Sequence, residues 1–161
     1  MKNLISVIGI GNPLRSDDAI GILLLDFLRE CENNISSNVV FIDGGTGGMN
    51  LLHIITDYQV VLLIDAVQFG ALPGSWKFFS LDDVINQSST SNMSTHISDI
   101  FEVIMIAKKI GKKPPHLYVF GVQPLDLSFG QGLSEPLQKK LPDLKISLKK
   151  KLSYIVETFN S

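Results

Sequence analysis

The stretch "VIGIGNPLRSDDAIG", from Val7 to Gly21, predicts the first strand and first helix of a layered α/β fold. Its apolar beginning is typical of a buried strand, and Gly9 and Gly11 indicate a tight turn after it. Asp17 and Asp18 follow where a helix should begin, because acids are favoured at the positive end of the helix dipole. The stretch therefore predicts carboxylates close to the end of a buried strand.

Length and composition favour a single domain covering residues 1–161, with 45% hydrophobic residues to build its core. The formal net charge of −2 provides no general attraction to nucleic acid or to an anionic membrane. The lone Cys31 excludes an internal disulfide and is typical of a reducing compartment. No apolar run reaches the roughly 18 residues that a membrane helix needs. We therefore expect a cytoplasmic protein with no nucleic-acid partner and no membrane insertion.

Five short apolar runs predict the strands of one sheet. Four of them are nearly continuous in Val, Ile and Leu, which is typical of parallel strands covered on both faces. The fifth follows Asp65 after the turn "GALPGS" with no room for a crossover helix, so we expect an antiparallel edge strand. The expected strands are Leu4–Ile10, Val39–Asp43, Val60–Asp65, Trp76–Ser80 and Leu117–Val122.

Helical patterns separate these runs. They cover Asp17–Glu30, residues 48–58 ("GMNLLHIITDY"), residues 96–111 and the tract from Ser134 onward, where we expect an interruption near Pro142. The lysines at 149–151 are interpreted as a solvated face of that last tract. Strands that alternate with helices indicate an α/β fold, a three-layer α/β/α sandwich with right-handed crossovers and a five-stranded, mostly parallel sheet.

Four residues become candidates for chemistry because ligands gather at the carboxyl ends of parallel strands. Asp18, Asp43 and Asp65 each follow or end an expected strand, and His96 begins the later helix. Acids that share a site repel one another unless a cation, a proton or distance separates their charges. Two carboxylates with one imidazole suit a divalent ion such as nickel, zinc or iron. Lacking a fourth ligand, such a site is open to a metal carried by another molecule.

Each candidate also has a plainer interpretation. Asp17 and Asp18 fit first-turn acids of a helix, and Asp43 before "GGTGG" fits a side chain that binds turn amides. His96 fits an ordinary helix-start residue. Asp65 differs, because it ends a strand expected to be buried, where an unpaired carboxylate is costly. The residues alone leave these alternatives open.

A nucleotide-binding interpretation of the opening stretch is disfavoured. Gly9 and Gly11 fit the first two glycines of a dinucleotide fingerprint, but Leu14 stands at the third position. Asp17 and Asp18 would also repel a pyrophosphate at the helix start. The chain contains no GK[ST] loop, no G-x-S-x-G elbow, no HExxH and no CxxC.

At these residues the sequence resembles the hydrogenase maturation endopeptidases. The matching pieces are "GIGNPLRSDDAIG", "DGGTGG", "LLIDAVQFGALPG", "STH" before a helix and "GVQPLDLSFGQGLSEPL", in the family's order. The resemblance implies an α/β/α fold with a twisted five-stranded sheet. It also implies an aspartic-type peptidase that removes the C-terminal extension of a [NiFe] hydrogenase large-subunit precursor after nickel insertion.

Matched to this chain, the resemblance implies that Asp18, Asp65 and His96 contact nickel carried by the substrate. Asp43 is our candidate for a further contact or the general base. We expect no tightly bound organic cofactor and a monomer whose partner is the precursor. Ala19 stands where many members have glycine. Asp18 has a shorter side chain than the Glu found at this position in other members. The alternatives are a nickel-sensing or metal-transfer module without peptidase activity and a nucleotide-binding α/β enzyme.

Overall fold

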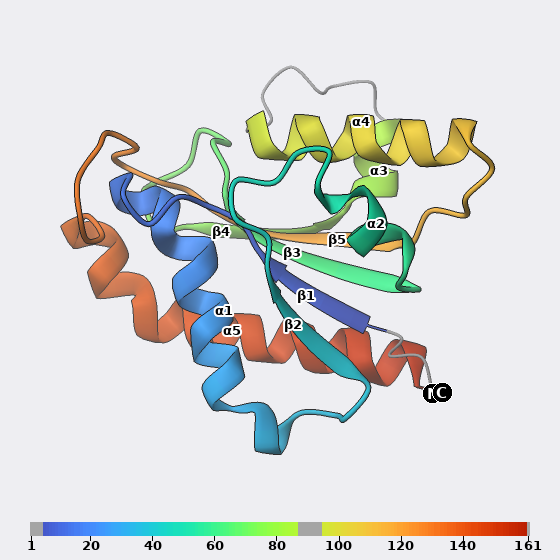
Figure 1. The fold of residues 1–161 in the computed structure, drawn as a ribbon. Coiled ribbons are helices and arrows are strands. Elements are labelled where there is room, and N and C mark those ends of the chain that lie inside the picture. The colour runs from blue at the N-terminus through green and yellow to red at the C-terminus, as the bar shows by residue number, and fades with distance from the viewer. Residues whose placement is uncertain (1–4, 87–94, 161) are drawn as a thin grey trace.

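The structure, a computed structural model, describes residues 5–86 and 95–160. Within them a sheet lies between two layers of helices (Figure 1). This confirms the three-layer α/β/α class. The elements are β1 (Ile5–Gly9), η1 (Ser16–Ala19), α1 (Ile20–Glu30), η2 (Glu32–Asn34), β2 (Val39–Asp43), α2 (Leu51–Thr56), β3 (Val60–Ala66), β4 (Trp76–Ser80), α3 (Leu81–Asn86), α4 (Thr95–Lys109), β5 (His116–Val122) and α5 (Glu135–Phe159).

The sheet has five strands in the order β2-β1-β3-β5-β4. Its first four strands are parallel, and β4 pairs antiparallel with β5, as the short turn before Trp76 predicted. The chain leaves β1 toward β2 on one side and returns to β3 on the other side of β1. The connections reverse direction between β1 and β3, and parallel sheets bind ligands at the carboxyl ends of such a strand pair.

Two apolar cores form because the strands alternate their side chains between the two faces of the sheet. One core joins the sheet to α1 and α5, and the other joins it to α2, α3 and α4. Figure 1 shows α1 and α5 on one side of the sheet and α2, α3 and α4 on the other. Helix α3 was not predicted, although Asp82 and Asp83 in its first turn are typical of a helix start.

Helix α5 runs without interruption from Glu135 to Phe159, so the expected break near Pro142 is wrong. Proline removes one helical hydrogen bond, but Leu144 and Leu148 after it lie buried in the core and hold the continuing turns. Figure 1 shows the helix changing direction along its first half, where Pro142 lies. The proline bends the helix but does not end it.

The lysines of α5 divide between solvent and an aromatic patch. Lys149 and Lys150 are exposed, as expected. The Nζ atom of Lys151 instead lies 5.1 Å from the ring centroid of Phe78 and 5.7 Å from that of Trp76.

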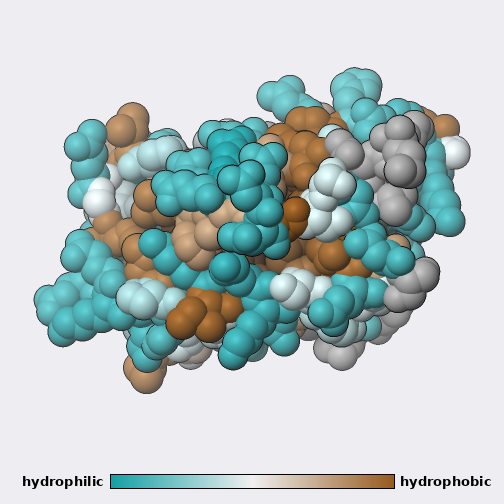
Figure 2. Space-filling view, turned by 90° about the horizontal axis from the view of Figure 1, so that it is seen from below, coloured by the Kyte–Doolittle hydropathy of each residue, from teal (hydrophilic) through white to brown (hydrophobic). Residues whose placement is uncertain are grey.

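Figure 2, which views the molecule from the α5 side, shows mostly hydrophilic side chains with small apolar patches between them. In the part of the chain that the structure describes, no helix combines the length and apolar character needed to cross a membrane.

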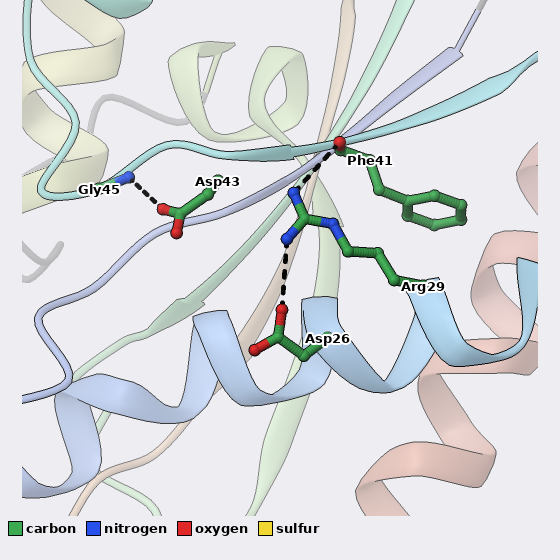
Figure 3. A network of polar contacts seen from close by, with 5 residues as sticks. All are labelled: Asp26, Arg29, Phe41, Asp43 and Gly45. Carbon is green, nitrogen blue, oxygen red and sulfur yellow. Dashed lines mark hydrogen bonds and ion pairs between the residues drawn. The ribbon is translucent and has the colours of Figure 1, made fainter.

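The outer edge of β2 is partly covered by a side chain of α1. Figure 3 shows Arg29 reaching from α1 to the carbonyl oxygen of Phe41, with an Nη2–O distance of 3.4 Å. The guanidinium also lies 3.3 Å from Oδ1 of Asp26. These contacts are exposed and contribute little stability, but they occupy an acceptor that an edge strand would otherwise present to another chain.

Candidate metal centre

Asp18 reaches the carboxyl edge of the sheet through a tight turn after β1. Gly11 has a φ of 148°, and a Cβ atom there would lie 1.9 Å from the carbonyl oxygen of Asp18, so glycine is required. The Asp18 carboxylate is largely buried, and its Oδ2 atom accepts a hydrogen bond of 2.8 Å from the backbone N–H of Asn12. The turn and the acid therefore hold each other in place.

Asp65 and His96 form a close pair beside it. Asp65 lies on β3 and is fully buried, whereas His96, in the first turn of α4, keeps 20% of its side chain exposed. The Nδ1 atom of His96 lies 3.0 Å from Oδ1 and 3.2 Å from Oδ2 of Asp65. An imidazole placed this way helps to balance a carboxylate that would be costly to bury alone.

The neighbours of His96 raise its pKa above the usual 6.5. The hydrogen bond with Asp65 is the largest cause, because it stabilises the imidazolium form. Burial acts in the opposite direction, and the negative charges of Asp65, Asp18 and Asp99 add to the increase. The cluster therefore favours a positive charge in its centre.

Asp18, Asp65 and His96 come together as the sequence predicted. Each offers one ligand atom, and these three atoms all lie within 4.8 Å of one another. Donors bound at about 2.1 Å to one ion lie about 3–4 Å apart, so small side-chain movements suffice for the three to share a cation. The trio lies at the β1–β3 reversal, where the topology favours a ligand site.

Asp43 lies apart from this trio. It ends β2, is exposed, and its Oδ1 atom accepts a hydrogen bond of 2.8 Å from the N–H of Gly45. Figure 3 shows the carboxylate directed toward that amide. The plainer interpretation of Asp43, a side chain that binds a turn amide, is therefore present in the structure, and the trio of potential ligands does not include it.

Gln123 fixes the segment that follows Asp65. Its buried Oε1 atom accepts a hydrogen bond of 2.8 Å from the N–H of Phe69, and its Nε2 atom donates to Oε1 of Gln68 at 2.7 Å. These bonds tie the loop after β3 to the end of β5. Gln123 thus stabilises the loop after β3 rather than the three candidate ligands themselves.

Sequence reasoning missed the place of Asp17. It lies in the first turn of η1, as expected, but it is fully buried and its carboxylate binds Leu125, Asp126 and Ser134. The partner Ser134 lies 117 positions away, and no local pattern marks such a contact. The family motif "GVQPLDLSFGQGLSEPL" includes this segment, but the motif assigned no function to it.

Residues 27–149 match the family model described as hydrogenase maturation protease. The chain belongs to the hydrogenase maturation protease family. The resemblance drawn from its motifs is thereby confirmed. The hydrogenase expression/formation protein HupD of Thiocapsa roseopersicina is 34% identical over 146 residues, which cover 89% of this chain and 66% of that protein. HupD of Rhizobium leguminosarum bv. viciae is 32% identical over 139 residues, covering 86% and 68%.

This family member thus spans about two thirds of the length of those curated relatives. Among solved structures, the hydrogenase maturating endopeptidase HybD from E. coli superposes with a TM-score of 0.78. The alignment covers 94% of this chain and 93% of HybD at 24% identity. At that identity the likeness shows a common fold, which is the five-stranded sheet with helices on both faces described above.

Proposed function

We propose that this protein is an endopeptidase that removes the C-terminal extension of a [NiFe] hydrogenase large-subunit precursor after nickel insertion. Membership of the maturation protease family supports the peptidase activity and the substrate class. The observation that carries the site assignment is the convergence of Asp18, Asp65 and His96 within 4.8 Å. We further propose that the protein acts as a cytoplasmic monomer.

In this proposal the nickel is part of the substrate and brings the cleavage point with it. Asp18, Asp65 and His96 bind the open face of an ion that the precursor already holds. Without substrate, a proton on the imidazole offsets the two acids, and the raised pKa of His96 favours that state. Nickel replaces the proton, because the imidazole nitrogen that binds a metal must be deprotonated.

Binding of the ion orients the scissile peptide against the protease and converts an encounter between two proteins into a local reaction. When held by these residues, the metal would supply Lewis-acid polarisation of a nearby carbonyl or water. The proposed chemistry is of the aspartic type, in that a carboxylate activates water and no covalent nucleophile takes part. Asp43 is the proposed general base or further contact, at the end of the strand next to β1.

The contacts of the first loop disfavour the nucleotide-binding alternative. The N–H of Gly11 donates to the carbonyl of Gly45, and the N–H of Asn12 donates to Asp18, each at 2.8 Å. A pyrophosphate needs such amides free to donate. The Asp18 carboxylate already stands in the place where the anion would bind.

A mass measurement on the precursor tests the proposal. Purified protein mixed with nickel-loaded precursor should release the C-terminal extension, and nickel-free precursor should remain intact. Asp65→Asn, which keeps the size of the side chain, should lower the processing rate at least a hundredfold. Asp26→Asn, a change to an exposed acid on α1, is the matched control and should keep the wild-type rate.

Three outcomes would each contradict a part of the proposal. If Asp65→Asn processed the nickel-loaded precursor at the wild-type rate, the assignment of Asp65 to the site would be wrong. Nickel binding with no shortened product, using precursor that a related protease does cleave, would instead support the nickel-sensing module. Efficient cleavage of nickel-free precursor would contradict recognition through nickel, whereas the proposed peptidase activity would stand.

A further inference from the structure

A third buried carboxylate, Asp17, lies next to Asp18 in the sequence and has no part in the chemistry above. It is fully buried. Its Oδ2 atom accepts hydrogen bonds from the N–H of Leu125 at 2.8 Å, the N–H of Asp126 at 3.0 Å and Oγ of Ser134 at 2.8 Å. Its Oδ1 atom accepts one from the N–H of Ser134 at 2.7 Å. Four donors thus compensate for the burial of this charge.

The donors belong to one segment, residues 124–134, which we name the strap. It runs from the end of β5 to the residue that precedes α5. Ser134 is the N-cap of that helix, so the Asp17 carboxylate also lies at the positive end of a 25-residue helix dipole. A negative charge is therefore favoured at this place, with the strap wrapped around it.

The strap also holds the backbone of the turn that carries Asp17. The N–H of Asp17 donates to the carbonyl of Asp126, and the N–H of Ser16 donates to that of Gly130, both at 2.9 Å. The Oγ atom of Ser16 donates to the carbonyl of Ser128 at 2.9 Å. Contacts from both backbone and side chains thus attach two consecutive residues to the strap.

Ser16 marks this turn as strained. Its φ of 51° makes it the one non-glycine residue with positive φ in the described parts of the chain. A residue with a Cβ atom adopts this conformation at a cost in free energy, and it persists only where its surroundings determine it strongly. Here the surroundings are the strap. Without it, we expect the turn to relax toward ordinary backbone angles.

Asp18 follows this strained turn directly. Its carboxylate is bound on the other side by the N–H of Asn12. Because ligand atoms must lie within tenths of an ångström of their productive places, a small rotation of the turn would carry Asp18 away from Asp65 and His96.

We infer that Asp17 is a positioning residue, whose buried carboxylate binds the strap and thereby fixes the turn that places Asp18 beside Asp65 and His96. This inference rests on the proposed function for its effect on processing, but its effect on the geometry of Asp18 can be measured separately. Asp17 touches no reacting atom. It acts through the backbone of the residue next to it.

The main test is Asp17→Asn, which keeps the shape but turns one acceptor into a donor that faces the N–H and O–H groups of the strap. With nickel-loaded precursor, kcat should fall at least tenfold while KM stays within twofold of wild type. Ser134→Ala removes one of the four donors and should lower kcat two- to threefold. Thr158→Ala, which removes a hydroxyl bonded to the carbonyl of Tyr154 at the far end of α5, should change neither value.

A second readout needs no substrate. The backbone amide of Asn12 reports on Asp18 because it donates to that carboxylate. In Asp17→Asn its NMR resonance should shift and its hydrogen exchange should become at least tenfold faster. The amide of Leu62, inside β3, should keep its wild-type shift and exchange rate. A general loss of stability would instead change the exchange of both amides together.

The outcomes separate the two proposals. A folded Asp17→Asn protein with wild-type kcat and an unchanged Asn12 amide overturns the inference, whatever the wild type cleaves. If wild-type protein fails to process the precursor, the proposed function fails and the Asn12 amide alone decides the positioning role. Should Asp17→Asn not fold, Ser134→Ala decides, and wild-type behaviour of that variant in both readouts overturns the inference.

Discussion

His96 Nδ1 lies between the two carboxylate oxygens of Asp65, 3.0 Å from one and 3.2 Å from the other. The acid is fully buried, whereas the imidazole keeps one-fifth of its side chain exposed. The pair joins β3 to the first turn of α4 and connects the strand that ends in the site to the helix that covers it. Its charge state consequently affects the stability of the folded protein.

The first prediction concerns the pH dependence of this pair in metal-free protein. The pKa of His96 is raised in the folded state, so its contribution to stability is fully present below the unfolded pKa of about 6.5. It is lost as the pH rises through the folded pKa. The difference in unfolding free energy between wild type and Asp65→Asn should therefore be largest below pH 6.5 and shrink at higher pH.

Urea unfolding at several pH values between 5 and 9 measures this difference, and an NMR titration of the imidazole should give a lower pKa for His96 in Asp65→Asn than in wild type. Asp26→Asn serves as the control, and its titration curve for His96 should match that of wild type. A gap between wild type and Asp65→Asn that widens as the pH rises would reverse the sign and contradict the prediction.

The second prediction concerns Gly21, where α1 packs against the sheet. A Cβ atom there would lie 2.1 Å from the carbonyl oxygen of Ile10 and 2.5 Å from that of Ile64. Both are backbone atoms, so α1 must move away. Gly21→Ala should lower the free energy of unfolding by about 3 kcal/mol, measured by urea denaturation. Asp26→Ala on the same helix should cost less than about 1 kcal/mol. Equal stability of the two variants would show that α1 can shift freely.

The third prediction compares two hydroxyl groups. Ser6 Oγ is buried in β1 with no hydrogen-bond partner in the described protein, whereas Ser134 Oγ donates to the Asp17 carboxylate. Ser6→Ala should leave stability unchanged or raise it by about 1 kcal/mol, because an unpaired buried hydroxyl is costly. Ser134→Ala should lower it by about 2 kcal/mol, since its bond is to a charged group. Calorimetric unfolding of both variants measures the contrast, and a greater loss for Ser6→Ala would refute it.

The fourth prediction concerns Asp43 as the general base. Asp43→Asn keeps the Oδ1 acceptor for the N–H of Gly45 but removes the charge that accepts a proton. The processing rate should fall about a hundredfold with no loss of stability. Asp57→Asn, in an exposed acid at the end of α2, is the control and should process at the wild-type rate. A wild-type processing rate in Asp43→Asn would show that Asp43 is not the general base. Its role would then be the hydrogen bond with the turn amide of Gly45.

Much of the fold could be predicted because short-range patterns determined it. The bounds of β2 and β4 agree with the sequence prediction, since the apolar run of β2 ends before two glycines and that of β4 ends at Ser80, directly before α3. The antiparallel direction of β4 could be predicted because the connection after Asp65 is too short to contain a crossover helix. The convergence of Asp18, Asp65 and His96 followed from the rule that parallel strands end at one edge, once the family motifs had singled out these residues.

The errors arose where contacts between distant segments outweighed local preference. Pro142 was expected to interrupt α5, but burial of Leu144 and Leu148 keeps the helix continuous. Asp17 looked like an ordinary first-turn acid, yet its partners lie more than 100 residues further along the chain. Propensity and spacing describe neighbours in sequence, and neither contact is of that kind.

The strap has a consequence for when the site comes into being during synthesis. Translation delivers Asp18 and Asp65 early, but the carbonyl groups that bind Ser16 and the donors that bind Asp17 come from residues 124–134. Chains emerge from the ribosome N-terminus first and fold as enough of them becomes available. A nascent chain that ends before Ser134 carries the acids without the complete strap that aligns Asp18, so the site can form only after residues 124–134 have been made.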